Sequence, residues 1–220
     1  MVKPMHSNPI VVDQFLFVAD ELFPLFMVLV FLMPIYRFTS WIVSEKLNKT
    51  KDVSKSMGVS ETSYWLSWFF FYLTGMTPVS IICALLMTYG VLQNANLGPV
   101  LVLLWLFGLS LFGYIVLISS LFTKPSYASV VSTLFYFVTS FLDYLVANPH
   151  TPIYTKVLAS FLPQIAIKRA VVTIMQFETQ RRQLTMGNLG ETIHNYNLSI
   201  AYTMMLFSAV VFSLVGIYLT

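Results

Sequence analysis

Long apolar stretches alternate with short polar ones along most of this chain. Five of the apolar stretches are long enough to cross the roughly 30 Å hydrocarbon core of a bilayer as α-helices, which takes about 20 residues. Because backbone polar groups inside the hydrocarbon must bond to one another, helices are the structure that such stretches adopt. The pattern therefore predicts an all-α protein, a polytopic transmembrane helical bundle with five spans. The predicted spans cover residues 15–43, 64–91, 99–122, 127–146 and 198–219.

The polar segment 45–57, between the first two spans, combines four lysines with apolar residues at helical spacing. This combination is typical of a short helix that lies along a membrane surface. Gly58 follows directly, and a glycine there can take the left-handed backbone that closes a helix. Ser60 can then cap the helix that enters the bilayer. The four lysines are Lys46, Lys49, Lys51 and Lys55.

Residues 155–177 are also apolar, but Lys168 and Arg169 stand side by side near their middle. A basic residue at the centre of a span costs roughly 2.5 to 3.5 kcal/mol, so the pair would cost about 5 to 7 kcal/mol. Pro163 supplies a natural bend. We therefore predict a re-entrant helical hairpin that enters one leaflet and is covered by other helices, rather than a further span.

The composition agrees with this pattern. Hydrophobic residues make up 57% of the 220 residues and charged residues only 10%, against about a quarter in soluble domains, and the mean hydropathy is +0.77. We expect a single transmembrane domain over residues 1–220, in a multi-pass protein of the plasma membrane or an endomembrane. The net charge of +3 comes from short basic clusters, which argues against a nucleic-acid partner.

The chain lacks the residue patterns of most catalytic sites. None of its nine glycines is followed by lysine, so the sequence has no G-x-x-x-x-G-K-[ST] loop for nucleotide phosphates. We expect no ATPase activity from this chain alone, and no nucleotide-binding domain within it. Cys83 is the single cysteine and lies in an apolar run, which favours a packing role. His6, His150 and His194 are far apart without partners at ligand spacing, so we expect surface histidines and no metal site.

A few residues within or beside the spans bear on packing and transport. Asp20, Glu21 and Asp143 lie near span ends, where we expect them to be solvated or to face lipid headgroups. Gly108 and Gly113 lie inside the third span and offer places where another helix could approach closely. The spans carry almost no charge at mid-membrane, which argues against a secondary transporter or a channel.

Basic residues are divided equally between the two sides of the five-span arrangement. Arg37, the four lysines of segment 45–57 and Lys124 fall on one side, and the positive-inside rule favours this side as cytosolic because its charges crowd within one short loop. The basic residues of the opposite side are Lys3, Lys156, Lys168, Arg169, Arg181 and Arg182.

Short motifs recur along the chain in an order that resembles a known family. The motifs are, in order, Glu45-Lys46, Lys55, Met57-Gly58, Ser60, Trp65-Leu66-Ser67-Trp68-Phe69, Ser119-Ser120-Leu121-Phe122, Phe161-Leu162-Pro163, Asn197-Leu198-Ser199 and Met204-Met205-Leu206. Together they resemble subfamily A of the ATP-binding cassette transporters, the lipid-moving ABCA proteins, over nearly the whole chain. The basic pairs Lys168-Arg169 and Arg181-Arg182 depart from that family's pattern.

The resemblance implies that the five spans correspond to spans two to six of one half of a lipid transporter. Segment 45–57 would then be a cytosolic transverse coupling helix, and residues 155–177 a hairpin in the outer leaflet. The implied partners are a nucleotide-binding domain that uses ATP and Mg, a second transmembrane half in cis or in trans, and membrane lipids. The alternative is a truncated or stand-alone membrane protein that transports nothing.

The resemblance also implies two sets of functional residues. The lysines of the first set have a simpler interpretation as topology signals drawn to anionic headgroups, each by about 1 kcal/mol. Residues implied in coupling to an ATPase domain are Glu45, Lys46, Lys49, Lys51, Lys55, Met57 and Gly58. Residues implied in lining a lipid-facing cavity are Phe26, Phe31, Phe135 and Phe137.

Overall fold

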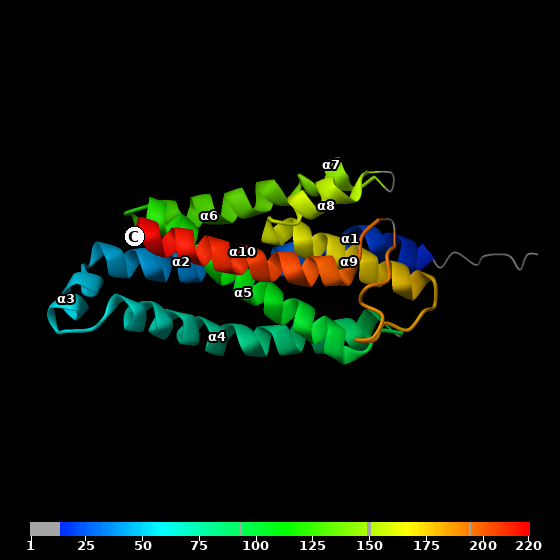
Figure 1. Ribbon diagram of the computed structural model, residues 1–220, viewed down its shortest axis with the longest axis horizontal. Helices are drawn as coiled ribbons and strands as arrows, with labels where there is room; N and C mark the ends of the chain where they lie inside the picture. The colour runs from blue at the N-terminus through cyan, green and yellow to red at the C-terminus, as the bar shows by residue number, and fades with distance from the viewer. Residues whose placement is uncertain (1–13, 93, 149–150, 194) are drawn as a thin grey trace, which may run out of the picture.

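The computed structural model describes residues 14–220 except 93, 149–150 and 194, with side chains from residue 22 onward. In this part of the chain the regular structure is helical, and the helices form one elongated bundle (Figure 1). The elements are α1 (Gln14–Val30), α2 (Leu32–Leu47), α3 (Thr50–Ser56), α4 (Glu61–Leu86), the π-helical turn η1 (Met87–Val91), α5 (Leu97–Leu121), α6 (Pro125–Ser140), α7 (Asp143–Val146), α8 (Ile153–Ala159), α9 (Pro163–Thr179) and α10 (Leu198–Leu219).

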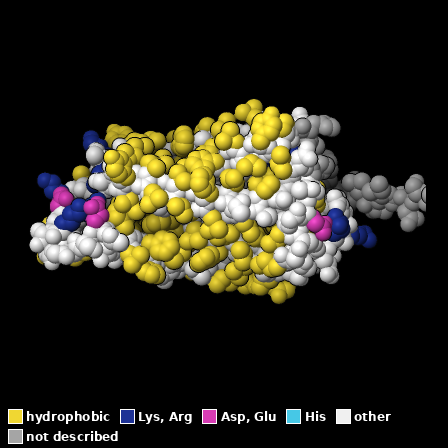
Figure 2. All heavy atoms as spheres, in the orientation of Figure 1, with side chains coloured by type: hydrophobic (Ala, Val, Ile, Leu, Met, Phe, Trp, Pro, Cys, Tyr) yellow, Lys and Arg dark blue, Asp and Glu magenta, His cyan; other side chains and the backbone are white. Residues whose placement is uncertain are grey.

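The described residues contain five helical segments that are long and apolar enough to span a membrane, which confirms the predicted number. The first segment runs through the end of α1 and all of α2, with a turn at Phe31 between them. Figure 2 shows hydrophobic side chains over the middle of the molecule and charged side chains gathered at its two ends. The five segments are Leu22–Leu47, Glu61–Val91, Leu97–Leu121, Pro125–Val146 and Leu198–Leu219.

Helix α5 forms the centre of the bundle, and 72% of its most apolar window is buried, against 22 to 33% in the other spans. Its close neighbour α10 crosses it at two glycines. A Cβ atom on Gly113 would lie 2.7 Å from the carbonyl oxygen of Ala209, and one on Gly216 would lie 2.7 Å from the nitrogen of Leu117. The close approach predicted at Gly113 is confirmed, since any side chain there would push the two helices apart.

The prediction of one continuous helix over residues 45–57 is wrong. Helix α2 continues to Leu47, and the chain then turns at Lys49, whose φ of 55° is left-handed, before the separate helix α3 begins at Thr50. Hydropathy gave no sign of this break, because Asn48 and Lys49 are polar residues that suit a surface helix equally well.

The predicted stop after α3 and the new start of α4 are confirmed. Gly58 has a φ of 88°, and its N–H donates to the carbonyl of Lys55 while the N–H of Val59 donates to that of Ser54. These two bonds form the Schellman arrangement that closes helices. The Ser60 side chain then accepts a bond from the N–H of Ser63 and caps α4.

Residues 155–177 fold into a helix pair, α8 and α9, that bends immediately before Pro163, the first residue of α9. Nearly every residue of α9 is buried, because α1, α5, α6 and α10 all pack against it. The bend at Pro163 and the cover by other helices agree with the predicted hairpin. That the hairpin enters only one leaflet stays a prediction.

Some residues singled out in the sequence fall outside the described part of the structure. They are His6, His150 and His194, together with the side chains of Asp20 and Glu21. Cys83 is described, and its half-buried free thiol packs against the hydrophobic core, which confirms its packing role.

Candidate functional site

The polar turn between α2 and α4, residues 45–61, is called the α3 corner here. It lies at one end of the bundle, at the end opposite α7 and α8 (Figure 1). Basic and acidic side chains crowd together at this end (Figure 2). The corner joins the first two spans, so any movement of α3 acts on both of them.

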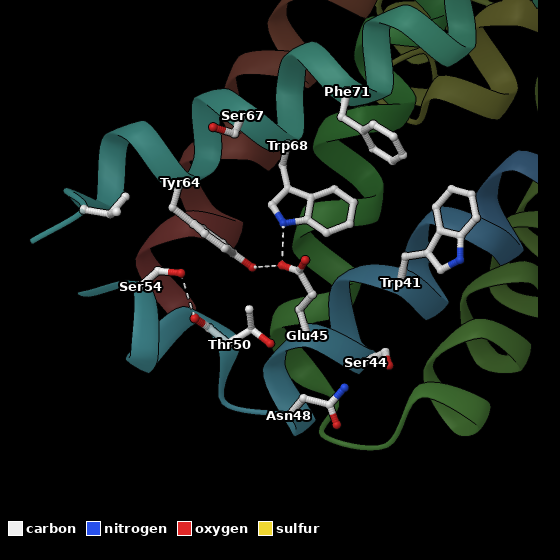
Figure 3. Close-up of a pocket in the computed structure, with 11 residues that line it drawn as sticks. Trp41, Ser44, Glu45, Asn48, Thr50, Ser54, Tyr64, Ser67, Trp68 and Phe71 are labelled. Atoms are coloured by element: carbon white, nitrogen blue, oxygen red, sulfur yellow. Dashed lines mark hydrogen bonds between the residues drawn. The ribbon is translucent and has the colours of Figure 1, made fainter. Parts of the chain in front are cut away.

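Glu45, in the last turn of α2, ties that helix to α4. Its Oε2 atom accepts a hydrogen bond from the Tyr64 hydroxyl at 2.8 Å and another from the Trp68 indole N–H at 3.0 Å. Figure 3 shows both side chains directed from α4 at the Glu45 carboxylate. Hydrogen bonds to a charged group are stronger than neutral ones, so this residue holds the entrance of the two spans at a fixed separation.

Lys46 ties the corner to the central helix. Its ammonium group donates to the carbonyl oxygen of Ser120 at 2.8 Å, in the last turn of α5. The carbonyls of a last helical turn have no partner within the helix and carry the negative end of the helix dipole. A lysine from α2 satisfies one of them here.

Glu61 ties α3 to the first turn of α4. Its two carboxylate oxygens pair with Lys51 at 2.7 Å and with Lys55 at 3.2 Å. The Lys51 ammonium also lies 5.6 Å from the centre of the Trp65 ring. Glu61 and Lys55 are exposed to solvent, where water and salt screen ion pairs and leave them little net energy. These contacts therefore orient α3 without locking it.

The outer side of α3 is apolar and uncovered. No residue of the helix is buried, and Met57, just after it, is 78% exposed. Val53 is exposed as well. Scattered exposed apolar residues are ordinary, but these two stand beside charged groups and form a small patch of the kind that partner surfaces cover.

The predicted coupling residues therefore divide into two groups. Glu45, Lys46, Lys51 and Lys55 contact α4 or α5, and Gly58 sets the turn. Lys49 and Met57 are exposed to solvent. The sequence did not reveal the partners in these contacts, which are Tyr64, Trp68, Glu61 and Ser120. Trp68 and Ser120 stood out only as parts of motifs, because a motif does not show which side chains meet in the fold.

An open pocket of about 610 Å³ lies inside the α3 corner, between α2, α3 and α4 (Figure 3). One part of its wall is aromatic and the other is made of small polar side chains and the Glu45 carboxylate. Its lining residues are Trp41, Ser44, Glu45, Asn48, Thr50, Ser54, Val59, Tyr64, Ser67, Trp68 and Phe71.

The four phenylalanines expected at a lipid-facing cavity do not share one surface. Phe26 and Phe135 are about half exposed. Phe31 lies elsewhere, because it is completely buried and packs edge-on against Phe107 with ring centres 4.7 Å apart. Phe137 is partly buried against the core and contacts Phe141.

The far end of the bundle holds a buried ion cluster around Asp143. The expectation that Asp143 is solvated is wrong: it is 5% exposed, and its carboxylate bonds the Arg169 guanidinium. Arg169 also donates to the Asp143 carbonyl at 2.8 Å, and Lys168 lies 3.7 Å from the second carboxylate oxygen. Lys168 further donates to the carbonyl of Ser140. This pairing offsets part of the cost of burying two basic residues in α9.

Two further polar groups lie beside this cluster. Lys156, on α8, is buried. Its burial lowers the pKa of its ammonium group, and the nearby positive charge of Arg169 lowers that pKa further. The Tyr196 hydroxyl bonds to Ser160 at 2.9 Å, while burial raises the pKa of Tyr196 to about 12. Sequence reasoning missed this network, since hydropathy does not reveal which charges meet in the fold.

Five spans, a polar corner between the first two and a covered helical hairpin define a multi-pass integral membrane protein. Residues 5–218 match the family described as ABC-2 family transporter protein, and the chain belongs to that family. The curated relatives that the chain resembles are members of sub-family A of the ATP-binding cassette transporters.

The chain is similar to several curated transporters, although it spans only about a tenth of their length. It is 24% identical over 223 positions to mouse ATP-binding cassette sub-family A member 17, which covers 98% of this chain and 13% of the relative. It is 26% identical to human sub-family A member 2, covering 94% of this chain and 9% of the relative. It is 27% identical to the mouse retinal-specific phospholipid-transporting ATPase ABCA4, with the same 94% and 9% coverage.

Proposed function

We propose that this chain is the membrane-spanning permease portion of an ATP-driven lipid transporter, and that the α3 corner couples the motion of an ATPase domain to lipid translocation. The observation that carries the proposal is the arrangement of the corner itself. Its inner side is bonded to α2, α4 and α5, while its outer side presents an apolar patch. The printed name of one relative, a phospholipid-transporting ATPase, supports lipid as the cargo.

The mechanism follows from the contacts of the corner. A nucleotide-binding domain, which would hold ATP and Mg on its own residues, would cover Val53 and Met57 and move α3 as it closes. Glu61 would pass that movement to α4, and Glu45 would keep α2 and α4 moving together. Small shifts at such a joint produce rigid-body tilting of the attached helices.

The lipid path is proposed on the surface of the first and fourth spans. Phe26 and Phe135 expose apolar rings there, and a second transmembrane half, in cis or in trans, would close the path from the other side. Phe31 is left out because it is buried inside this chain.

The test replaces Met57 by aspartate in the assembled transporter and measures co-purification of the ATPase domain and lipid-stimulated ATP hydrolysis. We expect both to fall at least about tenfold, because a charge would have to be desolvated inside the interface. Met186→Asp is the matched control, since Met186 is half exposed in a loop outside the α3 corner.

Unchanged co-purification of the ATPase domain and unchanged lipid-stimulated ATP hydrolysis in Met57→Asp would contradict the coupling role. Recovery of the chain from its own membrane with no ATPase partner would favour the alternative, a membrane protein that transports nothing.

A further inference from the structure

A small pocket lies beside the buried ion cluster, between α8, α9 and the loop that leads to α10. Its volume is about 80 Å³, and since a water molecule takes up about 30 Å³ in the liquid, the pocket has room for a small ion with one or two waters. Two of its lining residues are cationic, Lys156 and Arg169, and none of the described residues that line it is acidic. It is called the α8–α9 pocket here.

Arg169 brings hydrogen-bond donors to this pocket that the protein itself does not use. A guanidinium group carries five N–H donors. The Nε group of Arg169 bonds the Asp143 carboxylate, and its Nη2 atom donates to the Asp143 carbonyl at 2.8 Å. The other three N–H donors have no partner among the described residues, although Arg169 is only 7% exposed. Unused donors on a buried charge are costly, so they favour a ligand that accepts hydrogen bonds.

Lys156 brings a second positive charge to the same pocket, from α8. Its side chain is buried, with 1% of the residue exposed. Burial lowers the pKa of its ammonium group, and the positive charge of Arg169 lowers that pKa further. The two cations therefore repel each other, and an anion in the pocket that both of them line would be attracted by both.

The remaining polar residues of the pocket decide which kind of anion it suits. Gln176 lies seven residues after Arg169 on α9, so both are on the same face of that helix, and its amide can donate as well. The Thr173 hydroxyl already bonds the Arg169 carbonyl, and the Tyr196 hydroxyl is already in a hydrogen bond. Donors are therefore few, which favours a small monovalent anion. A divalent oxyanion such as sulfate has more acceptor sites to satisfy and costs more to bury.

We propose that the α8–α9 pocket binds one small monovalent inorganic anion, with chloride as the expected occupant, and that Arg169, Lys156 and Gln176 hold it. The ion connects α8 to α9 by bonding side chains from both helices, and it stabilises the helical hairpin. Binding needs neither ATP nor a partner protein, so it goes beyond the proposed function and is measured on this chain alone.

The test uses the chain reconstituted in phosphatidylcholine nanodiscs. The nuclear magnetic resonance line of chloride broadens when the ion exchanges with a protein site, and empty nanodiscs give the reference width. We expect excess broadening that bromide removes by competition and that gluconate, which is too large for the pocket, leaves unchanged. Replacing gluconate by chloride at constant sodium should also raise the midpoint of thermal unfolding by about 3 °C, because a ligand of the folded chain stabilises it.

Three variants locate the site, each with a matched control. Lys156→Gln removes one positive charge and should lower the affinity for chloride about tenfold. Arg169→Lys keeps a cation beside Asp143 but removes the guanidinium donors, and it should lower the affinity by a similar factor. Gln176→Leu removes a neutral donor and should lower the affinity about threefold. The controls are Lys124→Gln, Arg37→Lys and Gln183→Leu, which change exposed residues that do not line the pocket.

A chloride line no broader than with empty nanodiscs would overturn the proposal, because the pocket would then hold water only. Broadening that is unchanged in both Lys156→Gln and Gln176→Leu would overturn it as well. In gluconate, an equal rise of the unfolding midpoint on adding phosphatidylglycerol, absent in Lys156→Gln, would assign the pocket to a lipid headgroup instead. If Arg169→Lys fails to fold, the other two variants and their controls still decide the matter.

Discussion

The α3 corner and the hairpin end of the bundle use the same chemistry in opposite ways. Each places two cationic side chains around one carboxylate, Lys51 and Lys55 around Glu61 at the corner, and Lys168 and Arg169 around Asp143 at the hairpin. In the first cluster Glu61 and Lys55 are exposed and Lys51 is partly covered, whereas each side chain of the second cluster is less than a tenth exposed.

This difference separates a movable part of the molecule from a fixed part. Buried charges must keep their partners, since removing one leaves an unpaired charge in a medium of low dielectric constant. Exposed pairs can separate and re-form at little cost. We infer that the hairpin end holds the helices in place while the α3 corner, tied by weaker contacts, is where outside forces act.

The largest expected effect is at the fixed end. Asp143→Asn removes the charge between Lys168 and Arg169 and leaves both cations buried, so we expect a loss of about 3 to 5 kcal/mol in the stability of the folded chain. The midpoint of thermal unfolding in nanodiscs, read by size-exclusion chromatography after heating, measures this loss.

Asp52→Asn is the control for this variant, because Asp52 is an exposed acid on α3. We expect no measurable shift from it. An equal and small shift of the unfolding midpoint in both variants would mean that the buried ion cluster stabilises the fold no more than an exposed acid does. The proposed difference between the two ends would then be wrong.

Much of the fold followed from the sequence because it depends on local properties. Five spans follow from length and hydropathy, which a bilayer imposes directly. Gly58 and Ser60 mark helix ends through their own backbone preferences. The bend before Pro163 and the close helix contact at Gly113 likewise depend on one residue type each.

The contacts of the candidate site could not be predicted, because they join residues far apart in sequence. Asp143 and Arg169 are 26 residues apart, and Lys46 and Ser120 are 74 apart. Hydropathy placed Asp143 at a span end but could not show that α9 packs beside it. The burial of Phe31 against Phe107 has the same origin, since its sequence is as apolar as that of exposed Phe26.

An intermediate effect is expected at the turn that ends α3. Gly58→Ala adds a methyl group to a residue with a φ of 88°, where open space surrounds the new atom. The cost is therefore conformational, about 1 to 2 kcal/mol, and it should loosen α3 locally, which limited trypsin digestion at the corner would detect. Gly90→Ala is the control, since it also has open space but no left-handed backbone; equal digestion of the two variants would contradict the role of the turn.

The smallest effect on global stability is expected from Glu61→Gln, and it tests the contrast most directly. This change removes both ion pairs of α3 while α2 stays bonded to α4 through Glu45. The unfolding midpoint should stay unchanged, whereas trypsin should cut after Lys51 or Lys55 faster. In the unaltered chain, about 1 M salt should produce the same faster cutting, because the screening length falls to about 3 Å, and it should add nothing in the variant. A fall in the unfolding midpoint as large as that of Asp143→Asn would show that the α3 corner is as firmly fixed as the hairpin end. In that case α3 could not move without the rest of the bundle.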